Sequence, residues 1–511
     1  MTLTTRLIAV LLCLPLSAAM AAQADDPCAA LEPPDGVTFA SPPQWVEQEG
    51  LPRYCRVQGL IDGRIRFELR LPAAWRGTFV MAGCGGFCGE LLPDLSRPGN
   101  GILPSLKRGH AVIAHDAGHQ APSWETGWAA DPEALRIWSH EVLPRVTRAG
   151  VTLSGSMYGR APVYRYFNGC SNGGRLAAMA AQRYPDLFHG IAMGDPILDL
   201  SGTAGLWGNW VITSLQGPDG PLVDASRVPI LKRFVLDRCD ALDGDADGVI
   251  RNPSLCTADF DELACQGGQD PATCLSGDEV RAVRRLYGGV RNASGELVYP
   301  AQEYGSEHYA DIWLFPSREA KAWGGRASAG YRQILAMSLG EEDVPAGLST
   351  EQMLDWIARS PVPAMTDAKD PDLSAFARAG GKMIIYQGLA DPLIIPAPVL
   401  DYYERAAMTM GGLEELRDTA RLFMVPGFGH CWEKPAEGPD DFDPLAAVER
   451  WVEAGEAPQW LELRGRPGSG QPEGPMRLCA LAGSTGLNDE DCVTISPRPS
   501  RWVPISSGGT P

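Results

Sequence analysis

Long apolar runs are scarce in this chain of 511 residues. The apolar run at residues 7–16 is shorter than the roughly 20 residues that a membrane-spanning helix needs, and no later run reaches that length without charges. Basic residues are also few, because 44 Lys and Arg stand against 63 Asp and Glu, for a net charge of −19. Nucleic acids bind basic surfaces, so we expect neither a membrane-spanning nor a nucleic-acid-binding protein.

Repeats, low-complexity tracts and paired C-x-x-C motifs are also absent from the sequence. Without such cysteine pairs, a cysteine-bound structural metal is not expected. The length is enough for two to three domains.

The first 24 residues are typical of a secretory signal peptide. Arg6 supplies a positive charge, residues 7–16 form the apolar region, and residues 22–24 (Ala-Gln-Ala) form a small-residue cleavage site before Asp25. We therefore expect an exported protein, located in the periplasm or secreted.

The cysteine count agrees with export. Removal of Cys13 with the signal peptide would leave twelve cysteines, which in an oxidising compartment predicts up to six disulfides. Short spacings favour three local pairs, namely Cys239 with Cys256, Cys265 with Cys274, and Cys479 with Cys492. The pairing of four further cysteines stays open: Cys28, Cys55, Cys84 and Cys88.

Strand-like segments recur towards both ends of the chain, at residues 64–71, 77–82, 110–114, 163–167, 382–386 and 421–425. The first of these alternates apolar and polar side chains, as an outer strand does. Residues 175–183, rich in Ala, Leu and Met, predict a helix. Strands that alternate with helices indicate a parallel sheet covered on both faces, hence an α/β fold.

The residue pattern changes between about residues 200 and 372, where cysteines, glycines, tryptophans and acidic turns replace the alternation of strands and helices. We interpret residues 201–372 as an inserted lid domain and residues 25–200 and 373–511 as a discontinuous core. Five tryptophans lie in the lid: Trp207, Trp210, Trp313, Trp323 and Trp356. Each either packs in a core or forms an aromatic wall for a substrate, and the sequence leaves both readings open.

Ser171 lies in G-C-S-N-G-G (169–174), which contains the G-x-S-x-G pattern of a nucleophile turn. A serine hydroxyl is a weak nucleophile unless a base takes its proton, and that base is normally a histidine supported by a carboxylate. Asp391 and His430 each follow a predicted strand, and the order Ser, Asp, His is that of α/β-hydrolases. We predict a catalytic triad of Ser171, Asp391 and His430, although for an isolated G-x-S-x-G a structural turn is the commoner explanation.

Two of these candidates have a cysteine as chain neighbour, because Cys170 precedes Ser171 and Cys431 follows His430. A Cys170–Cys431 disulfide would join the nucleophile turn to the histidine loop and hold two distant loops in register.

An oxyanion hole needs two backbone N–H groups aimed at the developing negative charge. One should come from Asn172, the residue after the candidate nucleophile. The other should come from Gly85 and Gly86 in the glycine-rich segment 83–89, because glycine lets the backbone approach a ligand closely. The alternative is a plain turn; a dinucleotide or phosphate loop lacks support, since the spacing matches neither motif.

Three further histidines cluster around Asp116 in the sequence: His110, His115 and His119. A metal site is one reading, but third and fourth ligands are not evident. We favour a role in positioning loops near the site.

Carboxylates alternate along residues 240–248, at Asp240, Asp243, Asp245 and Asp247. Such hard oxygen ligands suit Ca²⁺, and from Asp243 the first, third, fifth and sixth places match an EF-hand loop. The twelfth place is Ser254 rather than Glu, so the EF-hand is incomplete. The Cys239–Cys256 pair would close this loop in place of flanking helices. We predict a structural calcium site, with a solvated acidic turn as the alternative.

Taken together, these segments resemble the tannase and feruloyl esterase family. The resemblance covers nearly the whole mature chain and rests on C-R-V-Q-G (55–59), G-C-G-G-F (83–87), Y-F-N-G-C-S-N-G-G-R (166–175), Q-R-Y-P-D (182–186), the acidic loop, G-L-A-D (388–391) and G-F-G-H-C (427–431). It implies an α/β-hydrolase fold, the triad named above, calcium bound by the four aspartates and the carbonyl of Val249, and an aromatic acyl pocket in the lid.

We therefore expect an exported serine esterase that hydrolyses carboxylic esters of aromatic acids, of feruloyl, galloyl or terephthaloyl type, through an acyl-enzyme on Ser171. The substrate is a small aromatic ester, and no organic cofactor is implied. One alternative is a short-chain carboxylesterase without aromatic preference. Another is a non-catalytic binding protein on a hydrolase scaffold.

Overall fold

The computed structural model describes residues 26–217, 220–316, 322–432, 438–465 and 475–481. The predicted signal peptide at residues 1–24 and Cys492 lie outside the described residues. Within the described part, no helix is both long enough and apolar enough to cross a membrane.

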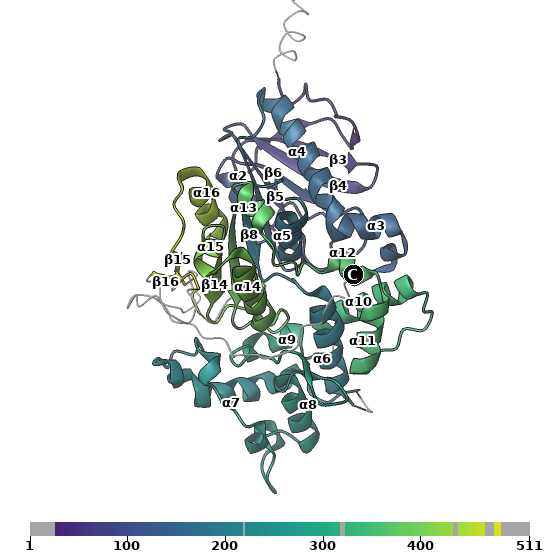
Figure 1. Cartoon of the computed structure of the whole chain (residues 1–511), viewed down its shortest axis with the longest axis vertical. Coiled ribbons are helices and arrows are strands. Elements are labelled where there is room, and N and C mark those ends of the chain that lie inside the picture. Colours follow the sequence, from purple (N-terminus) through teal and green to yellow (C-terminus); the bar gives the residue numbers. More distant parts are fainter. Residues whose placement is uncertain (1–25, 218–219, 317–321, 433–437, 466–474, 482–511) are drawn as a thin grey trace, which may run out of the picture.

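A twisted sheet forms the centre of the molecule (Figure 1). In the described residues its ten strands are β1 (Val37–Phe39), β2 (Gln44–Val46), β3 (Tyr54–Ile61), β4 (Ile65–Pro72), β5 (Thr78–Ala82), β6 (Ala111–His115), β7 (Tyr164–Cys170), β8 (Gly190–Gly194), β13 (Lys382–Gly388) and β14 (Ala420–Val425). The strand order is β1-β3-β4-β6-β5-β7-β8-β13-β14, with β2 paired to β3. From β6 to β14 all neighbouring pairs are parallel, whereas β1 to β4 and the β4–β6 pair are antiparallel. The predicted α/β architecture with a mostly parallel sheet is confirmed.

The six strands expected from the sequence are all present, with ends that differ by at most three residues. The outer position expected for β4 is wrong, because β4 lies between β3 and β6 and is almost entirely buried. Its polar residues explain the misleading alternation: Arg70 and Glu68 form a buried ion pair at 2.6 Å, and Gln58 of β3 donates a hydrogen bond to Glu68 at 2.6 Å. Paired polar groups can be buried, so alternation alone did not reveal the strand's position.

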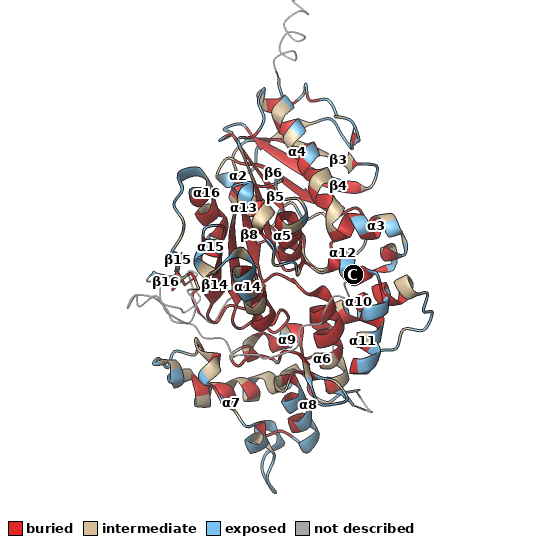
Figure 2. Ribbon diagram, in the orientation of Figure 1, coloured by how far each residue is buried: buried red, intermediate tan, exposed pale blue. Residues whose placement is uncertain are grey.

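Helices cover both faces of the sheet. They are α2 (Leu103–Lys107), α3 (Pro132–Arg136), α4 (Val142–Tyr158), α5 (Asn172–Arg183), α13 (Ser374–Arg378), α14 (Pro396–Met410), α15 (Leu413–Arg417) and α16 (Pro444–Ala454). Alternate residues of β5 enter two separate cores, with Phe79 and Met81 in one and Val80 and Ala82 in the other. Figure 2 shows the resulting buried strands.

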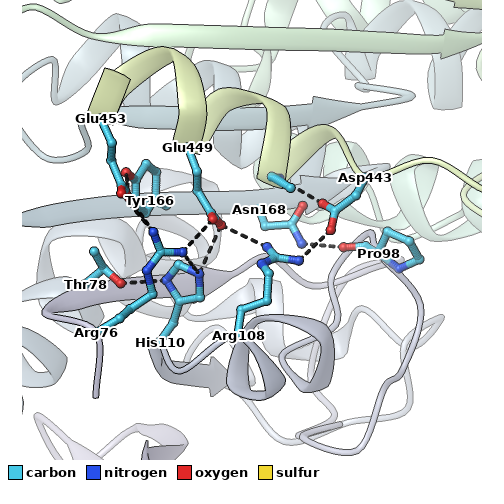
Figure 3. A network of polar contacts seen from close by, with 11 residues as sticks. Arg76, Thr78, Pro98, Arg108, His110, Tyr166, Asn168, Asp443, Glu449 and Glu453 are labelled. Carbon is cyan, nitrogen blue, oxygen red and sulfur yellow. Dashed lines mark hydrogen bonds and ion pairs between the residues drawn. The ribbon is translucent and has the colours of Figure 1, made fainter. Parts of the chain in front are cut away.

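One of these helices, α16, is attached to the sheet by an ionic network (Figure 3). Glu449 accepts hydrogen bonds from Arg76 and Arg108, each at 2.9 Å, and its carboxylate lies 3.1 Å from Nε2 of His110. Burial alone would raise the pKa of Glu449, but the hydrogen bond from His110 and the charges of His110 and Arg108 outweigh it and lower the pKa to about 2. A charged Glu449 therefore belongs to the folded state.

Residues 201–372, which we call the insertion, separate β8 from β13 and contribute no described strand to the central sheet. Its helices are α6 (Gly208–Leu215), α7 (Val228–Cys239), α8 (Gly277–Tyr287), α9 (Ala310–Trp313), α10 (Trp323–Leu339), α11 (Thr350–Arg359) and α12 (Val362–Thr366). Short paired strands complete it, β9 (Gln216–Gly217) with β10 (Gly220–Pro221) and β11 (Val290–Arg291) with β12 (Leu297–Tyr299). Most of the insertion lies beyond one edge of the sheet (Figure 1). A further pair, β15 (Trp460–Leu463) with β16 (Met476–Cys479), lies near the C-terminal end of the described chain.

Five disulfides join described cysteines, namely Cys28–Cys55, Cys84–Cys88, Cys170–Cys431, Cys239–Cys256 and Cys265–Cys274. Three of them are pairs predicted from the sequence, and the other two resolve the four cysteines that sequence left open. The predicted partner of Cys479, Cys492, lies outside the described residues.

Candidate active site

Ser171 occupies the sharp turn between β7 and α5. Its φ of 63° and ψ of −123° are strained for a residue with a side chain. The flanking glycines make the turn sterically feasible. A Cβ at Gly169 would lie 2.3 Å from the carbonyl oxygen of Gly173, and a Cβ at Gly173 would lie 2.1 Å from Oδ1 of Asn100. The G-x-S-x-G pattern therefore follows from close backbone packing at this turn.

The three predicted triad residues lie just beyond the carboxyl ends of β7, β13 and β14 and meet there, although Ser171 and His430 are 259 residues apart. Nε2 of His430 lies 2.9 Å from Oγ of Ser171, and Nδ1 of His430 lies 2.7 Å from Oδ2 of Asp391. The other oxygen of Asp391 accepts backbone hydrogen bonds from Leu393 at 2.8 Å and Ile394 at 2.9 Å. All three side chains are buried, and Ser171 is 7% exposed. The geometry fits proton transfer from serine to histidine.

The turn and the histidine loop are linked covalently and by hydrogen bonds. The Cys170–Cys431 disulfide joins them across 261 residues, with 6.0 Å between the Cα atoms. Asn100 accepts from the backbone N–H of Cys170 at 3.0 Å and donates to its carbonyl oxygen at 2.9 Å. Both backbone groups of the residue before Ser171 are thus fixed by one side chain, which the sequence analysis did not identify.

The glycine-rich segment faces the same site. Gly85 and Gly86 line a cavity together with Ser171 and His430, and the Cys84–Cys88 disulfide closes the turn that carries them. Among the described residues, neither glycine N–H donates a hydrogen bond to a protein acceptor. Asn172 is the first residue of α5, and its side chain is held by the buried guanidinium of Arg175 at 2.7 Å. The three predicted oxyanion-hole residues are therefore near Ser171, and their role remains a prediction.

Two cavities of different character adjoin Ser171. The first, of about 350 Å³, is lined by Ser171 and His430 and by the charged residues Glu90 and Arg97, and we call it the polar cavity. The second, the apolar cavity, has a volume of about 30 Å³, and none of its described lining residues is charged. Its lining includes Phe87, Trp124, Trp138, Ser171, Asn172, Leu200, Thr203, Ala204, Ala327 and Leu393. Ser171 thus lines both an apolar and a polar cavity.

The aromatic lining comes largely from outside the insertion. Phe87, Trp124 and Trp138 precede it in the sequence, and sequence analysis did not single them out. Of the lid tryptophans, Trp313 lines the polar cavity and packs edge-on against His430, with ring centroids 4.7 Å apart. Trp207 is buried and donates to the carbonyl of Pro392 at 3.1 Å. Trp210 donates to the carbonyl of Arg285 at 2.9 Å, and Trp356 is a buried core residue; the side chain of Trp323 lies outside the described residues.

A second buried carboxylate, Asp195, lies beside the predicted triad. Oxygens of Asp195 and Asp391 and a ring nitrogen of His430 lie within 4.8 Å of one another. Burial and the charge of Asp391 raise the pKa of Asp195 to about 7. The sequence did contain a pattern that could have identified Asp195 as a candidate site residue, because Asp195 directly follows the apolar segment G-I-A-M-G of β8.

The histidines near Asp116 do not assemble into a metal site. His110 faces Glu449 and α16, whereas Nδ1 of His115 accepts a hydrogen bond from the N–H of Ala117 at 3.2 Å. Burial lowers the pKa of both His115 and His119 to about 4, so both are neutral near pH 7. His115 lines the polar cavity, while the ring of His119 stacks on Trp128 with centroids 3.9 Å apart.

The acidic loop offers carboxylate oxygens that suit calcium. Burial, together with the nearby negative charges of Asp247 and Asp243, raises the pKa of Asp240, because both disfavour its ionised form. Arg251 provides counter-charge: its guanidinium pairs with Asp247 and lies 3.6 Å from Asp243 and 3.5 Å from Asp245. Among the described residues, no three side-chain oxygens from different aspartates of this loop lie within 4.8 Å of one another, so these oxygens do not converge on one point. The donor chemistry fits a hard cation, and the calcium site remains a prediction.

Comparison with known proteins shows the family to which this chain belongs. Residues 51–480 match the family model described as tannase and feruloyl esterase. The chain belongs to the tannase and feruloyl esterase family. Members of this family are carboxylic ester hydrolases, so the expectation of such an enzyme, rather than a non-catalytic binding protein, is confirmed.

Relatives within the family include a mono(2-hydroxyethyl) terephthalate hydrolase from Piscinibacter sakaiensis, which is 32% identical over 83% of this chain and 81% of its own length. A probable feruloyl esterase B-1 from Aspergillus flavus is 28% identical over 84% of this chain and 81% of its own length. The crystal structure of feruloyl esterase B from Aspergillus oryzae has a similar fold, with a TM-score of 0.76 at 23% identity, covering 90% of this chain and 95% of that one.

Proposed function

We propose that this chain is an exported serine esterase of the α/β-hydrolase type, which hydrolyses carboxylic esters of aromatic acids through an acyl-enzyme on Ser171. One observation carries the proposal: a continuous hydrogen-bond chain runs from Ser171 through His430 to Asp391, and Ser171 lines both an apolar and a polar cavity. Such a site can activate a nucleophile and hold the two halves of an ester apart.

In the acylation step, Nε2 of His430 takes the proton of the Ser171 hydroxyl as Oγ attacks the ester carbonyl. Asp391 accepts the Nδ1 proton in a hydrogen bond and stabilises the imidazolium. The backbone N–H groups of Asn172 and of Gly85 or Gly86 donate to the carbonyl oxygen as it becomes negative. The imidazolium then gives its proton to the alcohol oxygen, the carbon–oxygen bond to the alcohol breaks, and the acid stays bound to Oγ.

In the deacylation step, water takes the place of the departed alcohol. His430 removes a proton from the water as it attacks the acyl carbon, and later returns the proton to Oγ of Ser171. The acid leaves and the hydroxyl is restored. These steps use only residues of this chain and water.

The lining of the two cavities supports the assignment of each half of the substrate. Phe87, Trp124 and Trp138 offer faces and edges for an aromatic ring in the apolar cavity. The absence of charge among its described lining residues favours a neutral ring over one that bears a carboxylate. The alcohol faces the polar cavity, where Glu90 and Arg97 can bind hydroxyl groups. The names of the relatives, which act on terephthalate and feruloyl esters, also support an aromatic acid.

A short-chain carboxylesterase is the second candidate, and the size of the apolar cavity favours it. A volume of about 30 Å³ holds about two water molecules, which is less than an aromatic ring requires. An aromatic acid enters only if lining side chains such as Trp124 move, whereas an acetyl group, with three non-hydrogen atoms, requires less movement.

The two candidates are separated by kcat/KM on methyl esters of one series of acids, because a constant alcohol removes leaving-group effects. We expect methyl ferulate and methyl gallate to exceed methyl acetate and methyl butyrate by at least about tenfold, or roughly 1.4 kcal/mol. Mono(2-hydroxyethyl) terephthalate should be slower than its neutral analogue 2-hydroxyethyl benzoate. Equal or faster turnover of the aliphatic esters would support the short-chain esterase instead.

The role of Ser171 is tested in the same assays. Ser171→Ala should lower kcat by about 10⁴-fold or more while the circular dichroism spectrum stays unchanged, because the hydroxyl forms the covalent intermediate. A variant that keeps a tenth of wild-type activity would rule out the proposed nucleophile.

The insertion and the acidic loop complete the proposal. Residues 201–372 act as a lid domain over a core of residues 25–200 and 373–511. Asp240, Asp243, Asp245 and Asp247, with the carbonyl of Val249, would hold a structural Ca²⁺, whose charge would offset that of the aspartates. The five described disulfides support a site of action in the periplasm or outside the cell.

A further inference from the structure

Asp195 contacts each of the segments that carry the proposed triad. One carboxylate oxygen accepts the N–H of Gly388 at 2.7 Å, at the end of β13 and three residues before Asp391. The other accepts the N–H of Cys431 at 3.0 Å, next to His430. On the nucleophile side, the carbonyl of Gly194, the residue before Asp195, accepts the N–H of Ser171 at 3.0 Å.

The backbone of Asp195 is itself constrained. Its N–H donates to the carbonyl of Tyr386 at 2.9 Å, and its φ of 33° lies in the left-handed region that residues with side chains seldom adopt. The side chain is fully buried. A strained, buried carboxylate that binds two loop amides has a position fixed by its contacts.

The charge of Asp195 also reaches the site. The titratable groups that face it are Asp391, His430 and Tyr386. Its carboxylate does not hydrogen-bond to the imidazole, because Asp391 already occupies Nδ1 and Ser171 occupies Nε2. Asp195 can therefore act on His430 only through the electrostatic field of its carboxylate and through its hydrogen bonds to the loops that carry Asp391 and His430.

We propose that Asp195 is a positioning residue of the active site, which holds the Asp391 and His430 loops in register and whose negative charge stabilises the imidazolium formed at His430. The inference rests on the proposed triad. When the proton of Ser171 moves to Nε2, positive charge appears within a few ångströms of two buried carboxylates rather than one. Water does not screen that interaction, so the second carboxylate favours the charged state. Ionisation of Asp195 near neutral pH makes this contribution dependent on pH.

The decisive measurement is the pH dependence of kcat/KM for Asp195→Asn with a methyl ester substrate. In the wild type, the rising limb should contain two ionisations, those of His430 and Asp195. In Asp195→Asn, the limb should follow one ionisation and shift to lower pH, because loss of the negative charge disfavours the imidazolium. At the plateau, kcat should fall by about tenfold.

Asp199→Asn is the matched control. Asp199 is also buried, lies four residues further along, and accepts hydrogen bonds from Ser201 at 2.9 Å and Lys369 at 3.1 Å rather than contacting the triad. This control should lower the melting temperature and leave the pH profile at its wild-type position. An Asp195→Asn profile that coincides with that of the wild type would overturn the proposal, as would an equal shift in the control.

A measurement on the wild-type protein covers the case in which Asp195→Asn does not fold. The low-field NMR resonance of the Nδ1 proton of His430 should move in two steps between pH 5 and pH 9, and a single step would overturn the proposal. Full activity of Ser171→Ala would instead refute the triad. Loss of activity in Ser171→Ala together with an unchanged Asp195→Asn profile would refute only the role of Asp195.

Discussion

In the folded chain, Asp195 binds its proton at pH values where the unfolded chain has already released it. Burial and the charge of Asp391 raise its pKa from 3.8 to about 7. A group with a raised folded pKa adds stability below its unfolded pKa, and that contribution is lost as pH rises towards the folded pKa. The stability that Asp195 contributes should thus decline between pH 4 and pH 7.

We expect this decline to be visible as a difference between the wild type and Asp195→Asn. From pH 4 to pH 7, the free energy of unfolding of the wild type should fall relative to that of the variant, by at most about 1.4 kcal/mol per pH unit. Urea titrations at several pH values measure it. Parallel curves for the two proteins over this range would contradict the shifted pKa.

At the scale of elements, the buried carboxylate of Glu449 is the member of the α16 network that contacts both Arg76 and Arg108 (Figure 3). Glu449→Gln should destabilise the protein by roughly 3 kcal/mol at pH 7, because the pKa of Glu449 is lowered from 4.5 to about 2 and its cationic partners would lose their counter-charge. A depressed pKa gives stability that is present above pH 4.5 and is lost as pH falls towards 2, so the difference between the two proteins should shrink over that range.

Glu453 provides the matched control on the same helix, one turn further along. It pairs with Arg76 at 2.8 Å but is more exposed to solvent, so Glu453→Gln should cost less than about 1 kcal/mol. Denaturant unfolding of both variants gives the comparison. Equal losses for the two would argue against the special role of Glu449.

The Cys170–Cys431 disulfide links the β7–α5 turn to the loop after β14. The double replacement Cys170→Ser and Cys431→Ser should lower kcat by about tenfold or more in protein that is still folded, since small displacements of catalytic groups are costly. The matched control is the pair Cys28→Ser and Cys55→Ser, which removes a disulfide between the N-terminal segment and β3. If kcat falls only in proportion to the folded fraction in both variants, the disulfide serves stability alone.

At the scale of the whole molecule, the insertion and the core meet at the loop that carries His430. The hydroxyl of Tyr309 donates to the carbonyl of Gly427 at 2.9 Å, and the ring of Trp313 packs on His430. A Cβ at Gly427 would lie 3.1 Å from Cγ1 of Val249, so the end of the acidic loop packs against the same segment.

The proposed calcium site is tested by a chelator. A chelator should lower the melting temperature by at least about 3 °C and added Ca²⁺ should restore it, because a ligand that binds only the folded state stabilises that state. Asp243→Asn should abolish the response, whereas Asp261→Asn, on an exposed aspartate outside the loop, should retain it. Identical melting curves of metal-free and calcium-loaded protein would contradict the calcium site.

The sequence by itself determined the parts of this protein that depend on neighbours along the chain. The turn at Ser171 needs glycines at positions 169 and 173 because their backbones approach each other, so the motif is visible in the sequence. Strands of the parallel sheet are buried on both faces, so they stand out as apolar runs, and Asp391 and His430 are recognisable because each follows such a run. The order Ser, Asp, His along the chain then predicted a catalytic triad, and the family resemblance implied the same three residues.

Only the tertiary structure decided which distant residues share the site. Asn100 and Asp195 act on residues far along the chain, and the aromatic lining from Trp124 and Trp138 depends on how loops before the insertion fold over Ser171. The pairing of Cys28 with Cys55 was open for the same reason, since several partners had similar spacings. The order of strands in a sheet places residues side by side independently of their separation in sequence, and no local pattern records that order.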